Sequence, residues 1–585
     1  TVLNQMKKLR NTNVEELKGL TEITEEEYDK AIQEVEDGLK FKRGTITDNS
    51  NISFHTAAAI DQIATQLAEE KEINYTTARD LIKNSGYKIY TTQDTSIQDV
   101  MEKEYLKSKY IRKATTKVGK QQNQHTQSAM VVIDHKTGYV VGTVGGLGKD
   151  SSPLDQNRAT QSYLQPGSSI KPLAAIGPAL EEKVITAATM YDDSPTSFGG
   201  QTYYNSTGYP GIIPVRAAVE RSSNIVNMKI LANVGLDESI KYLNEFGLSK
   251  YDKSDEMLTL TLGGTPNGAS PLQMAAAYAA IANGGEYIKP VFYTKLENSS
   301  GKVILEAKQE KRRVLSEQNA YILTNILKSP VYGFMGHSTA TSCAISGMET
   351  AAKTGTTTDY KDRWLCGFTN YYACAAWYGF DDPERISFPG TNPAGQLFSG
   401  IMSEIHKGLE NSEFKEPEKI VHEKVCRTSG RLATDKCSNT YEEIFVEGHL
   451  PEECDAHKSQ YTVCTESGEL ATKYCPETER RSSNYVVEKE RLELWTTPGI
   501  NSTMGKAPTE YCTIHTKPEE VQKPQETNTT TEKPKDNETN KPDNGNTNTN
   551  VKPSTDDGTT TKPDKPESGG NNSGNTGENT GENTG

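Results

Sequence analysis

The N-terminal part of the chain is polar and has helical spacing of its apolar positions. Thr24 precedes three acidic residues, as a helix cap would, and the spacing predicts helices over 24–32 and 52–85. Residues 86–92 alternate between apolar and polar side chains, which predicts a short strand, and another helix is expected from about Asp94.

From about residue 127 the pattern becomes strand-like. The apolar, β-branched runs 129–134 and 139–144 are separated by a turn and predict a hairpin. Residues 272–281 are almost wholly apolar and predict a buried helix, and strands return near 351 and over 364–380. These elements predict an α/β domain in which one sheet has helices on both faces.

The C-terminal part contains an internal repeat. Residues 425–437 and 463–475 match each other, and a Cys-x-x-His pair follows each copy, at Cys454–His457 and Cys512–His515. A repeat of this quality predicts two small modules with the same local fold. Residues 516–585 contain almost no apolar side chains, so we expect them to be disordered.

Composition and motifs exclude several classes of function. The chain has 585 residues and a net charge of −15, which predicts several domains and argues against nucleic acid as a partner. We find no apolar run long enough for a transmembrane helix, and the chain starts at Thr1, so we interpret it as a processed product or a fragment. The central region has no metal-ligand spacing, phosphate-binding loop or dinucleotide fingerprint, and we expect no metal or other cofactor for its chemistry.

The run 165–172 carries the most informative candidate chemistry. Ser168 and Lys171 are three residues apart, so a helix would place a nucleophile and an amine on one side. A serine hydroxyl needs an adjacent base, and a lysine can be that base if burial or nearby positive charge lowers its pKa. The alternative is a capping serine beside an exposed lysine.

Two further motifs follow in order along the chain. Ser222 and Asn224 form a Ser-x-Asn motif, and Lys353–Gly355 form a Lys-Thr-Gly motif followed by Thr356. The order Ser-x-x-Lys, Ser-x-Asn, Lys-Thr-Gly is that of the serine acyl-transferases, which include penicillin-binding proteins and class A β-lactamases. The alternative for Ser222 and Asn224 is a helix cap.

Beyond these motifs the chain resembles the class A penicillin-binding proteins, the bifunctional peptidoglycan synthases of bacterial cell walls. The similar segments are 89–94, 257–264, 270–274, 362–369 and 377–381. The resemblance implies a penicillin-binding/serine β-lactamase-like α/β (α+β) domain with a central antiparallel sheet. It implies no metal or cofactor.

The resemblance also divides the chain into regions. The family's N-terminal membrane anchor and glycosyltransferase motif are not found here, so we expect no glycosyltransferase activity of this chain. The expected regions are a linker remnant (1–48), a helical and strand linker or pedestal (49–115), the transpeptidase domain (116–415), the two cysteine modules (421–515) and the disordered tail (516–585).

The resemblance assigns roles residue by residue. Ser168 is the expected nucleophile toward the D-Ala-D-Ala bond of a stem peptide, and Lys171 accepts its proton. Ser222 relays a proton to the leaving amine, Asn224 holds the substrate amide, and Lys353 helps keep Lys171 neutral.

The third motif has further expected roles. The hydroxyls of Thr354 and Thr356 bind the terminal carboxylate, and the N–H groups of Ser168 and Thr356 form the oxyanion hole. A side chain at Gly355 would crowd a substrate lying along the strand.

The implied function is a serine D,D-transpeptidase that cross-links stem peptides and is acylated by β-lactam antibiotics. The alternatives are a D,D-carboxypeptidase, a β-lactamase, or a non-catalytic penicillin-binding sensor or scaffold. A β-lactamase would need a deacylating glutamate, and we find no convincing one between the second and third motifs. The implied partners include the cell-wall synthesis machinery at the outer face of the cell membrane, with membrane attachment only through the missing anchor.

The cysteines leave two interpretations open. Cys366 and Cys374 flank a probable turn and form either a cross-strand disulfide or two buried thiols. For the six C-terminal cysteines we favour disulfides over zinc, because the spacing of the third cysteine differs between the copies. The favoured pairs are Cys426–Cys437 and Cys464–Cys475, followed by Cys454–Cys512.

Overall fold

The computed structural model describes ten segments of the chain, and every structural statement below concerns them. They are residues 2–10, 23–38, 52–115, 124–149, 151–152, 156–388, 390–454, 456, 460–484 and 510–516. The predicted disordered tail therefore lies outside the described residues, apart from Thr516, and so does His457.

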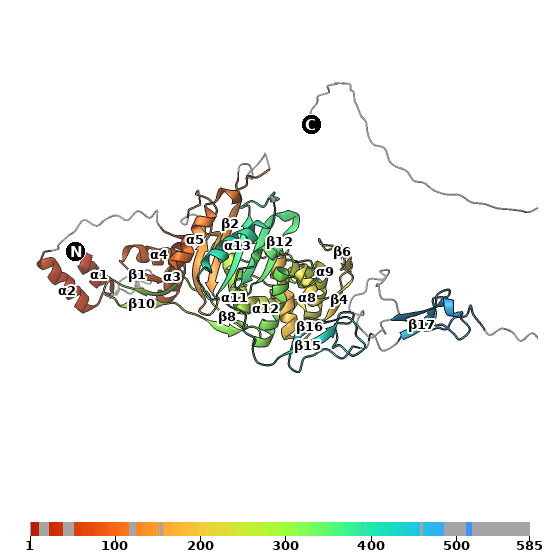
Figure 1. Ribbon diagram of the computed structural model, residues 1–585. Coiled ribbons are helices and arrows are strands. Elements are labelled where there is room, and N and C mark those ends of the chain that lie inside the picture. The colour runs from red at the N-terminus through yellow and green to blue at the C-terminus, as the bar shows by residue number, and fades with distance from the viewer. Residues whose placement is uncertain are drawn as a thin grey trace, which may run out of the picture. The chain divides into compact units, whose positions relative to one another are not determined.

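A five-stranded antiparallel sheet forms the centre of the fold (Figure 1). Its strand order is β12-β13-β14-β2-β3, so β12 is an edge strand. The predicted hairpin is confirmed, because β2 pairs with β3 across the turn before residue 139. The strand bounds are Gln127–Asp134 (β2), Tyr139–Val144 (β3), Ala351–Thr356 (β12), Asp362–Phe368 (β13) and Tyr372–Gly379 (β14).

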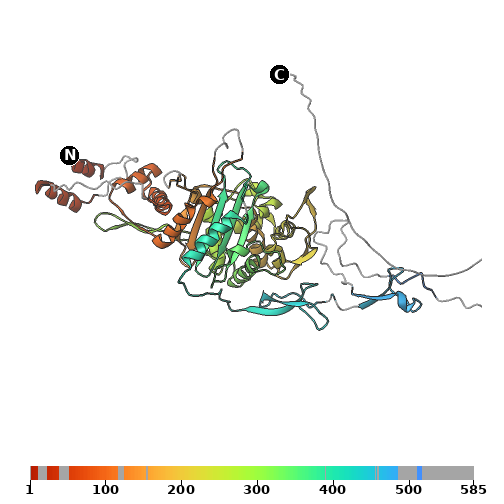
Figure 2. The same ribbon diagram turned by 45° about the horizontal axis from the view of Figure 1, so that its top comes forward.

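Helices cover both faces of this sheet, as the sequence predicts (Figure 2). The apolar helix α11 (Pro271–Ala282) lies in the core on one face, where Ser270 caps it in a capping box with Gln273. Helices α5 (Thr95–Tyr105) and α13 (Pro393–Ile405) pack against the other face. Side chains alternate between the two cores along each strand, as a sheet buried on both faces requires.

The remaining elements around the site lie, in the order of the sequence, between the β2–β3 hairpin and strand β12. The helices are α6 (Arg158–Gln161), α7 (Gly177–Glu181), α8 (Val215–Glu220), α9 (Asn224–Val234), α10 (Leu236–Glu245) and α12 (Glu317–Tyr332). The strands pair in twos: β4 (Met190–Asp192) with β7 (Ile212–Pro214), β5 (Thr196–Phe198) with β6 (Gln201–Tyr203), and β8 (Glu286–Ile288) with β11 (Lys311–Arg313).

The N-terminal elements follow the predicted pattern. Thr24 caps α2 (Glu25–Glu36) in a capping box, after α1 (Val2–Arg10), and Asp94 caps α5. Helices α3 (Phe54–Lys71) and α4 (Tyr75–Asn84) share a small core with a three-stranded sheet. That sheet joins β1 (Lys88–Thr91) to β9 (Tyr293–Glu297) and β10 (Val303–Glu306), so two distant stretches of the chain build it.

The two cysteine-containing modules each contain one two-stranded sheet, as a shared local fold requires. In the first module, β15 (Ile420–Cys426) pairs with β16 (Thr440–Val446), and in the second, β17 (Gln460–Cys464) pairs with β18 (Arg480–Asn484). Both strand pairs are antiparallel. The predicted duplication is therefore visible in the strand pairing of the described residues.

The strand register decides the state of the two cysteines in the central sheet. Cys366 lies opposite Ala375, whereas Cys374 lies opposite Gly367. Cys366 shares the face of its partner Ala375, whereas Cys374 is the neighbour of Ala375 on β14 and points to the opposite face. The two sulfurs therefore lie in different cores. Both are buried thiols, and the cross-strand disulfide is excluded.

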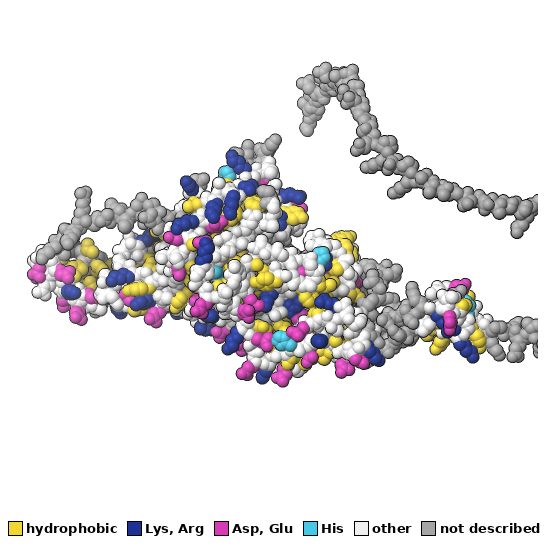
Figure 3. Space-filling view, viewed as in Figure 1, with side chains coloured by type: hydrophobic (Ala, Val, Ile, Leu, Met, Phe, Trp, Pro, Cys, Tyr) yellow, Lys and Arg dark blue, Asp and Glu magenta, His cyan; other side chains and the backbone are white. Residues whose placement is uncertain are grey.

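Charged side chains of both signs lie on the surface of the described residues. On the face shown in Figure 3, basic and acidic side chains of the described residues are interspersed. No described helix combines the length and the apolar composition needed to cross a membrane.

A buried ion pair attaches the first module to the central domain. The Arg216 guanidinium, on α8, makes two hydrogen bonds to the Glu443 carboxylate on β16, and one of them is 2.7 Å long. Only 8% and 1% of these side chains are exposed. Arg216 also donates to the Asn325 carbonyl at 2.9 Å, which fixes its orientation.

We therefore expect Glu443→Ala to lower the free energy of unfolding by about 3 to 5 kcal/mol, because it leaves a buried guanidinium without its partner. Thermal denaturation measures the change. Glu442→Ala is the matched control, because the neighbouring Glu442 side chain is 68% exposed and should change stability by less than about 0.5 kcal/mol. Equal effects of the two substitutions would contradict the assigned role of the pair.

Candidate active site

Ser168 lies in a tight turn of helix and not in a regular α-helix. A 3-10 helix spans Gly167–Ile170 and continues into a π-helical turn over Pro172–Ile176. The Lys171 N–H donates to the Ser168 carbonyl, and Pro172 has no N–H with which to continue an α-helical ladder. Residues three apart overlie each other in a 3-10 helix, so Ser168 and Lys171 still share one side.

The serine turn lies directly against the edge strand β12. A Cβ atom added to Gly167 would lie 2.6 Å from the Thr356 carbonyl oxygen, and one added to Gly355 would lie 2.3 Å from the Pro166 carbonyl oxygen. The structure thus gives a reason for Gly355 that the sequence did not: a side chain there would meet the backbone of the serine turn. The glycines hold Ser168 beside the end of the strand.

The proposed oxyanion hole lies at this contact. The Thr357 N–H donates to the Asp362 carbonyl of β13. Successive N–H groups of a strand point in opposite directions, so the Thr356 N–H points to the free edge of the sheet. A Cβ atom on Gly167 would be only 2.8 Å from the Thr356 nitrogen, so the backbone of the serine turn adjoins this donor.

Lys171 is almost completely buried, with 1% of its surface exposed. Its Nζ atom donates to the Ser222 carbonyl at 2.8 Å, the Ser223 carbonyl at 3.0 Å and Asn224 Oδ1 at 2.8 Å. Burial, followed by the positive charge of Lys353, holds the pKa of Lys171 well below its usual value. A neutral amine can accept a proton, so the environment prepares Lys171 as a base.

Lys353, on β12, contacts the same loop from the other side. Its side chain is fully buried, and Nζ donates to Ser222 Oγ at 2.7 Å and to the Thr354 carbonyl at 3.0 Å. Burial lowers the pKa of Lys353 to about 7. The structure thus brings Ser222 between two lysines, as the motifs predict.

The Ser222–Asn224 loop adopts an unusual backbone conformation. Ser222 has a φ of 58°, a left-handed conformation that is uncommon for residues other than glycine. This turn ends α8 and starts α9, and it directs the Ser222 hydroxyl to Lys353. The alternative is that Ser222 and Asn224 form a helix cap. The cap of α9 is instead Ser223, because its Oγ accepts the Val226 N–H at 3.0 Å.

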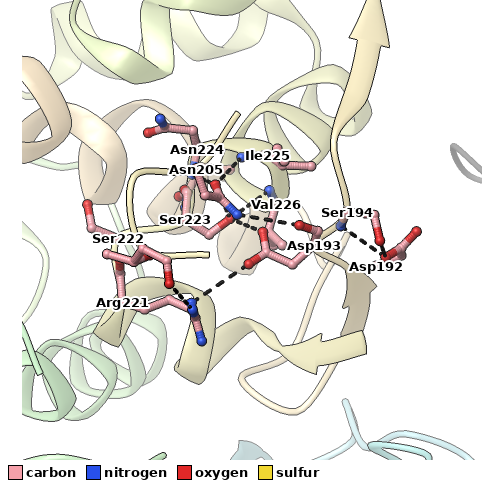
Figure 4. Close-up of polar contacts among 12 residues, drawn as sticks. Asp192, Asp193, Ser194, Asn205, Arg221, Ser222, Ser223, Asn224, Ile225 and Val226 are labelled. Carbon is pink, nitrogen blue, oxygen red and sulfur yellow. Dashed lines mark hydrogen bonds and ion pairs between the residues drawn. The ribbon is translucent and has the colours of Figure 1, made fainter. Parts of the chain in front are cut away.

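Buried polar residues behind this loop were not predicted from the sequence (Figure 4). Asp193 is fully buried and accepts a hydrogen bond from the Ser223 hydroxyl. Arg221 lies 3.8 Å from the same carboxylate, and Asn205 Oδ1 accepts the Asn224 N–H at 2.8 Å. Burial raises the pKa of Asp193. Asp193 and Asn205 lie far from the motifs in sequence, and only the pairing of short strands brings them near.

Thr354 and Thr356 occupy the other face of β12, because side chains alternate along a strand. Both are half-buried at the edge of the sheet. Arg363, opposite Thr356 on β13, donates to the Thr356 hydroxyl at 3.2 Å. Arg363 adds a positive charge that the motif-based prediction missed, although it sits in the similar segment 362–369.

Trp364 and Trp377 are core residues, with at most 1% of each side chain exposed. The Trp364 indole donates to the Gln165 carbonyl at 2.9 Å, which fixes the residue before the Pro166–Gly167 turn. The Trp377 indole donates to Asp362 at 2.9 Å. The first bond connects the central sheet to the serine turn, and the second joins β14 to β13.

Comparisons with known proteins agree with this geometry. Residues 128–383 match the penicillin binding protein transpeptidase domain, and residues 416–460 match the C-terminal domain of penicillin-binding protein 1A. Penicillin-binding protein 1A of Clostridium botulinum is 32% identical over 477 residues, which is 78% of this chain and 56% of the relative. The chain thus spans little more than half the length of that relative.

Solved structures share the fold. The crystal structure of penicillin-binding protein 1A from Haemophilus influenzae matches with a TM-score of 0.56 and 21% identity, over 73% of this chain and 80% of that one. PonA1 from Mycobacterium tuberculosis in complex with penicillin V matches with a TM-score of 0.52 and 23% identity, over 62% and 96%. From its matching domains and its sequence relatives, the chain belongs to the class A penicillin-binding proteins.

Proposed function

We propose that the chain is a serine D,D-transpeptidase that cross-links peptidoglycan stem peptides through an acyl-enzyme on Ser168. The observation that carries the proposal is the burial of Lys171 three residues from Ser168, with its Nζ held on the Ser222–Asn224 loop. A lysine used only for solubility would lie at the surface. A buried amine three residues from a serine is therefore a candidate for its base.

In the first step, Ser168 Oγ attacks the carbonyl carbon between the two D-alanines. Lys171 takes the hydroxyl proton, and the negative charge on the carbonyl oxygen is stabilised by the N–H groups of Ser168 and Thr356. One such donor contributes about 3 to 4 kcal/mol to the transition state in a known acyl-transfer enzyme. The carbon–nitrogen bond then breaks and leaves an ester on Ser168.

The leaving D-alanine must receive a proton on its nitrogen. We assign this relay to Ser222, because its hydroxyl accepts from Lys353 and its carbonyl accepts from Lys171. In the second step, an amine of another stem peptide attacks the ester and gives the cross-link, and Ser168 regains its proton. The atoms and protons of both steps balance with the groups named here.

The substrate is proposed to lie along the free edge of β12. An edge strand has unpaired backbone groups that an extended peptide can pair with. Asn224 would hold a backbone amide, and Thr354 and Thr356 would bind the terminal carboxylate. Arg363 supports this arrangement because it lies against Thr356 and supplies the opposite charge.

We extend the proposal to β-lactam antibiotics, which would acylate Ser168 in the same way. For a longer protein containing this chain, the family implies peptidoglycan glycosyltransferase activity, a place at the outer face of the cell membrane, and contacts with the cell-wall synthesis machinery. These remain proposals about that longer protein.

The nucleophile can be tested by labelling with fluorescent penicillin. We expect Ser168→Ala to abolish covalent labelling, because no other hydroxyl is expected to form the ester. Ser162→Ala, six residues upstream and outside the site, is the control and should be labelled like the unaltered chain. Labelling of the Ser168→Ala chain at the normal rate would contradict the assignment.

The pH dependence of acylation tests the role of Lys353. Acylation should slow as the pH falls through the lowered pKa of Lys171, because protonated Lys171 cannot accept the serine proton. In the unaltered chain, the charge of Lys353 lowers the pKa of Lys171 and the carboxylate of Asp193 raises it. Lys353→Met removes the charge that lowers this pKa. The pKa of Lys171 therefore rises, and the acidic limb of the rate profile should move to higher pH.

Lys353→Arg is the matched control, since it keeps the charge, and its acidic limb should lie closer to that of the unaltered chain. Rates follow from the time course of penicillin labelling at each pH. An acidic limb that stays in place in Lys353→Met would show that the charge of Lys353 does not act on Lys171.

The molecule that accepts the acyl group distinguishes a transpeptidase from a carboxypeptidase or a sensor. Incubation with a stem peptide and an amine acceptor should give a cross-linked dimer in addition to free D-alanine, as measured by mass spectrometry. Release of D-alanine without dimer would indicate a carboxypeptidase, and labelling by penicillin without either product would indicate a sensor.

A further inference from the structure

The second cysteine-containing module brings four metal-binding side chains to one point. The ligand atoms of Cys464, Cys475, Cys512 and His515 all lie within 4.8 Å of one another. The three cysteines are buried and His515 is partly buried. His515 Nδ1 lies 3.5 Å from both Cys464 Sγ and Cys512 Sγ.

These separations fit a tetrahedral zinc site. Zinc binds sulfur at about 2.3 Å and imidazole nitrogen at about 2.0 to 2.1 Å, so a regular tetrahedron separates the sulfur and nitrogen atoms by about 3.5 Å. A disulfide would instead need two sulfurs at about 2.05 Å. All three cysteines are thiols in the structure.

The surroundings of the cluster also suit a metal. His515 Nε2 lies 3.2 Å from a Glu466 carboxylate oxygen. An Nε2–H donated to that carboxylate leaves the lone pair on Nδ1, the atom that faces the sulfurs, and metal-binding histidines are commonly oriented in this way. The Thr472 N–H lies 3.3 Å from Cys475 Sγ and donates to it, which would stabilise a thiolate.

The first module repeats this arrangement. The sulfurs of Cys426, Cys437 and Cys454 lie within 4.8 Å of one another. The Thr434 N–H lies 3.3 Å from Cys437 Sγ, the same distance as in the second module. His457 follows Cys454 at the spacing of His515 after Cys512, but lies outside the described residues.

The backbone around the third cysteine is also duplicated. The Cys454 N–H donates to the Leu432 carbonyl at 2.7 Å, and the Cys512 N–H donates to the Leu470 carbonyl at 2.8 Å. The third cysteine follows the second by 17 residues in the first module and by 37 in the second. Because the same geometry is kept across this difference in length, the unequal spacing no longer argues against metal binding.

Disulfides fit the same cysteines less well. The predicted Cys454–Cys512 pair is wrong, because each of these sulfurs lies in the cluster of its own module. Pairing within a module leaves one of its three thiols over. It also gives no role to His515, whose Nδ1 faces two sulfurs.

We propose that the second module binds one zinc ion through Cys464, Cys475, Cys512 and His515, and that the first module binds another through Cys426, Cys437 and Cys454. Each thiol releases a proton to solvent as it becomes a zinc-bound thiolate. Four protein ligands close the coordination sphere of the second ion, which makes it a structural site. The ions connect strands to loops in modules with very small apolar cores.

Zinc content of the full chain tests the proposal. The chain is prepared under reducing conditions with Zn²⁺, then dialysed against zinc-free buffer and analysed for bound metal. We expect Cys512→Ala and Cys454→Ala each to remove one zinc ion per chain. Cys343→Ala is the control, because Cys343 is a buried thiol of the central domain outside both clusters, and it should change nothing.

A second measurement keeps the test independent of misfolding in the variants. The unaltered chain, never exposed to reductant, is denatured with a chelator and a thiol-alkylating reagent. Alkylation of all six module cysteines is expected if they bind zinc. Mass spectrometry that instead finds them in disulfides, or zinc retained in full by Cys512→Ala, would overturn the second site, and full retention by Cys454→Ala would overturn the first.

Discussion

The site depends on the burial of two lysines that make no ion pair among the described residues. Lys171 and Lys353 are held by carbonyl oxygens, a hydroxyl and an amide. An isolated ammonium group is strongly disfavoured in such surroundings, and the protein responds by lowering the pKa of both amines. The chemical result of that constraint is a pair of amines that lose their protons more easily than ordinary lysines.

The fold sustains this burial through close backbone contacts. Gly167 and Gly355 let the serine turn and the edge strand touch, so that Lys171 comes from one side and Lys353 from the other. The left-handed Ser222 lies between them, and Ser223 and Asp193 fix its loop from behind. The candidate catalytic residues therefore lie on a short helical turn and an edge strand, and the loop between them has an unusual conformation.

Much of this could be predicted from the sequence because it is encoded locally. Hydrophobic alternation predicted the β2–β3 hairpin and the buried α11, and three short motifs predicted the residues that meet around Ser222. The sequence did not predict roles for Asp193, Asn205 and Arg363, because these roles arise from pairing between strands that no local pattern reveals. The contact of Gly355 with the serine turn could not be predicted either, since the crowding atom belongs to a turn almost two hundred residues away. The spacing of the C-terminal cysteines and histidines already allowed zinc sites. Only the approach of His515 to two sulfurs in the structure favours a metal over disulfides.

The central claim is that Ser168 is the nucleophile and that Lys171 is its base. Intact mass measurement after penicillin treatment, followed by peptide mapping of the adduct, tests it most directly. The account predicts one adduct per chain, located on Ser168. An adduct on Ser222 or on any residue outside the serine turn would contradict it.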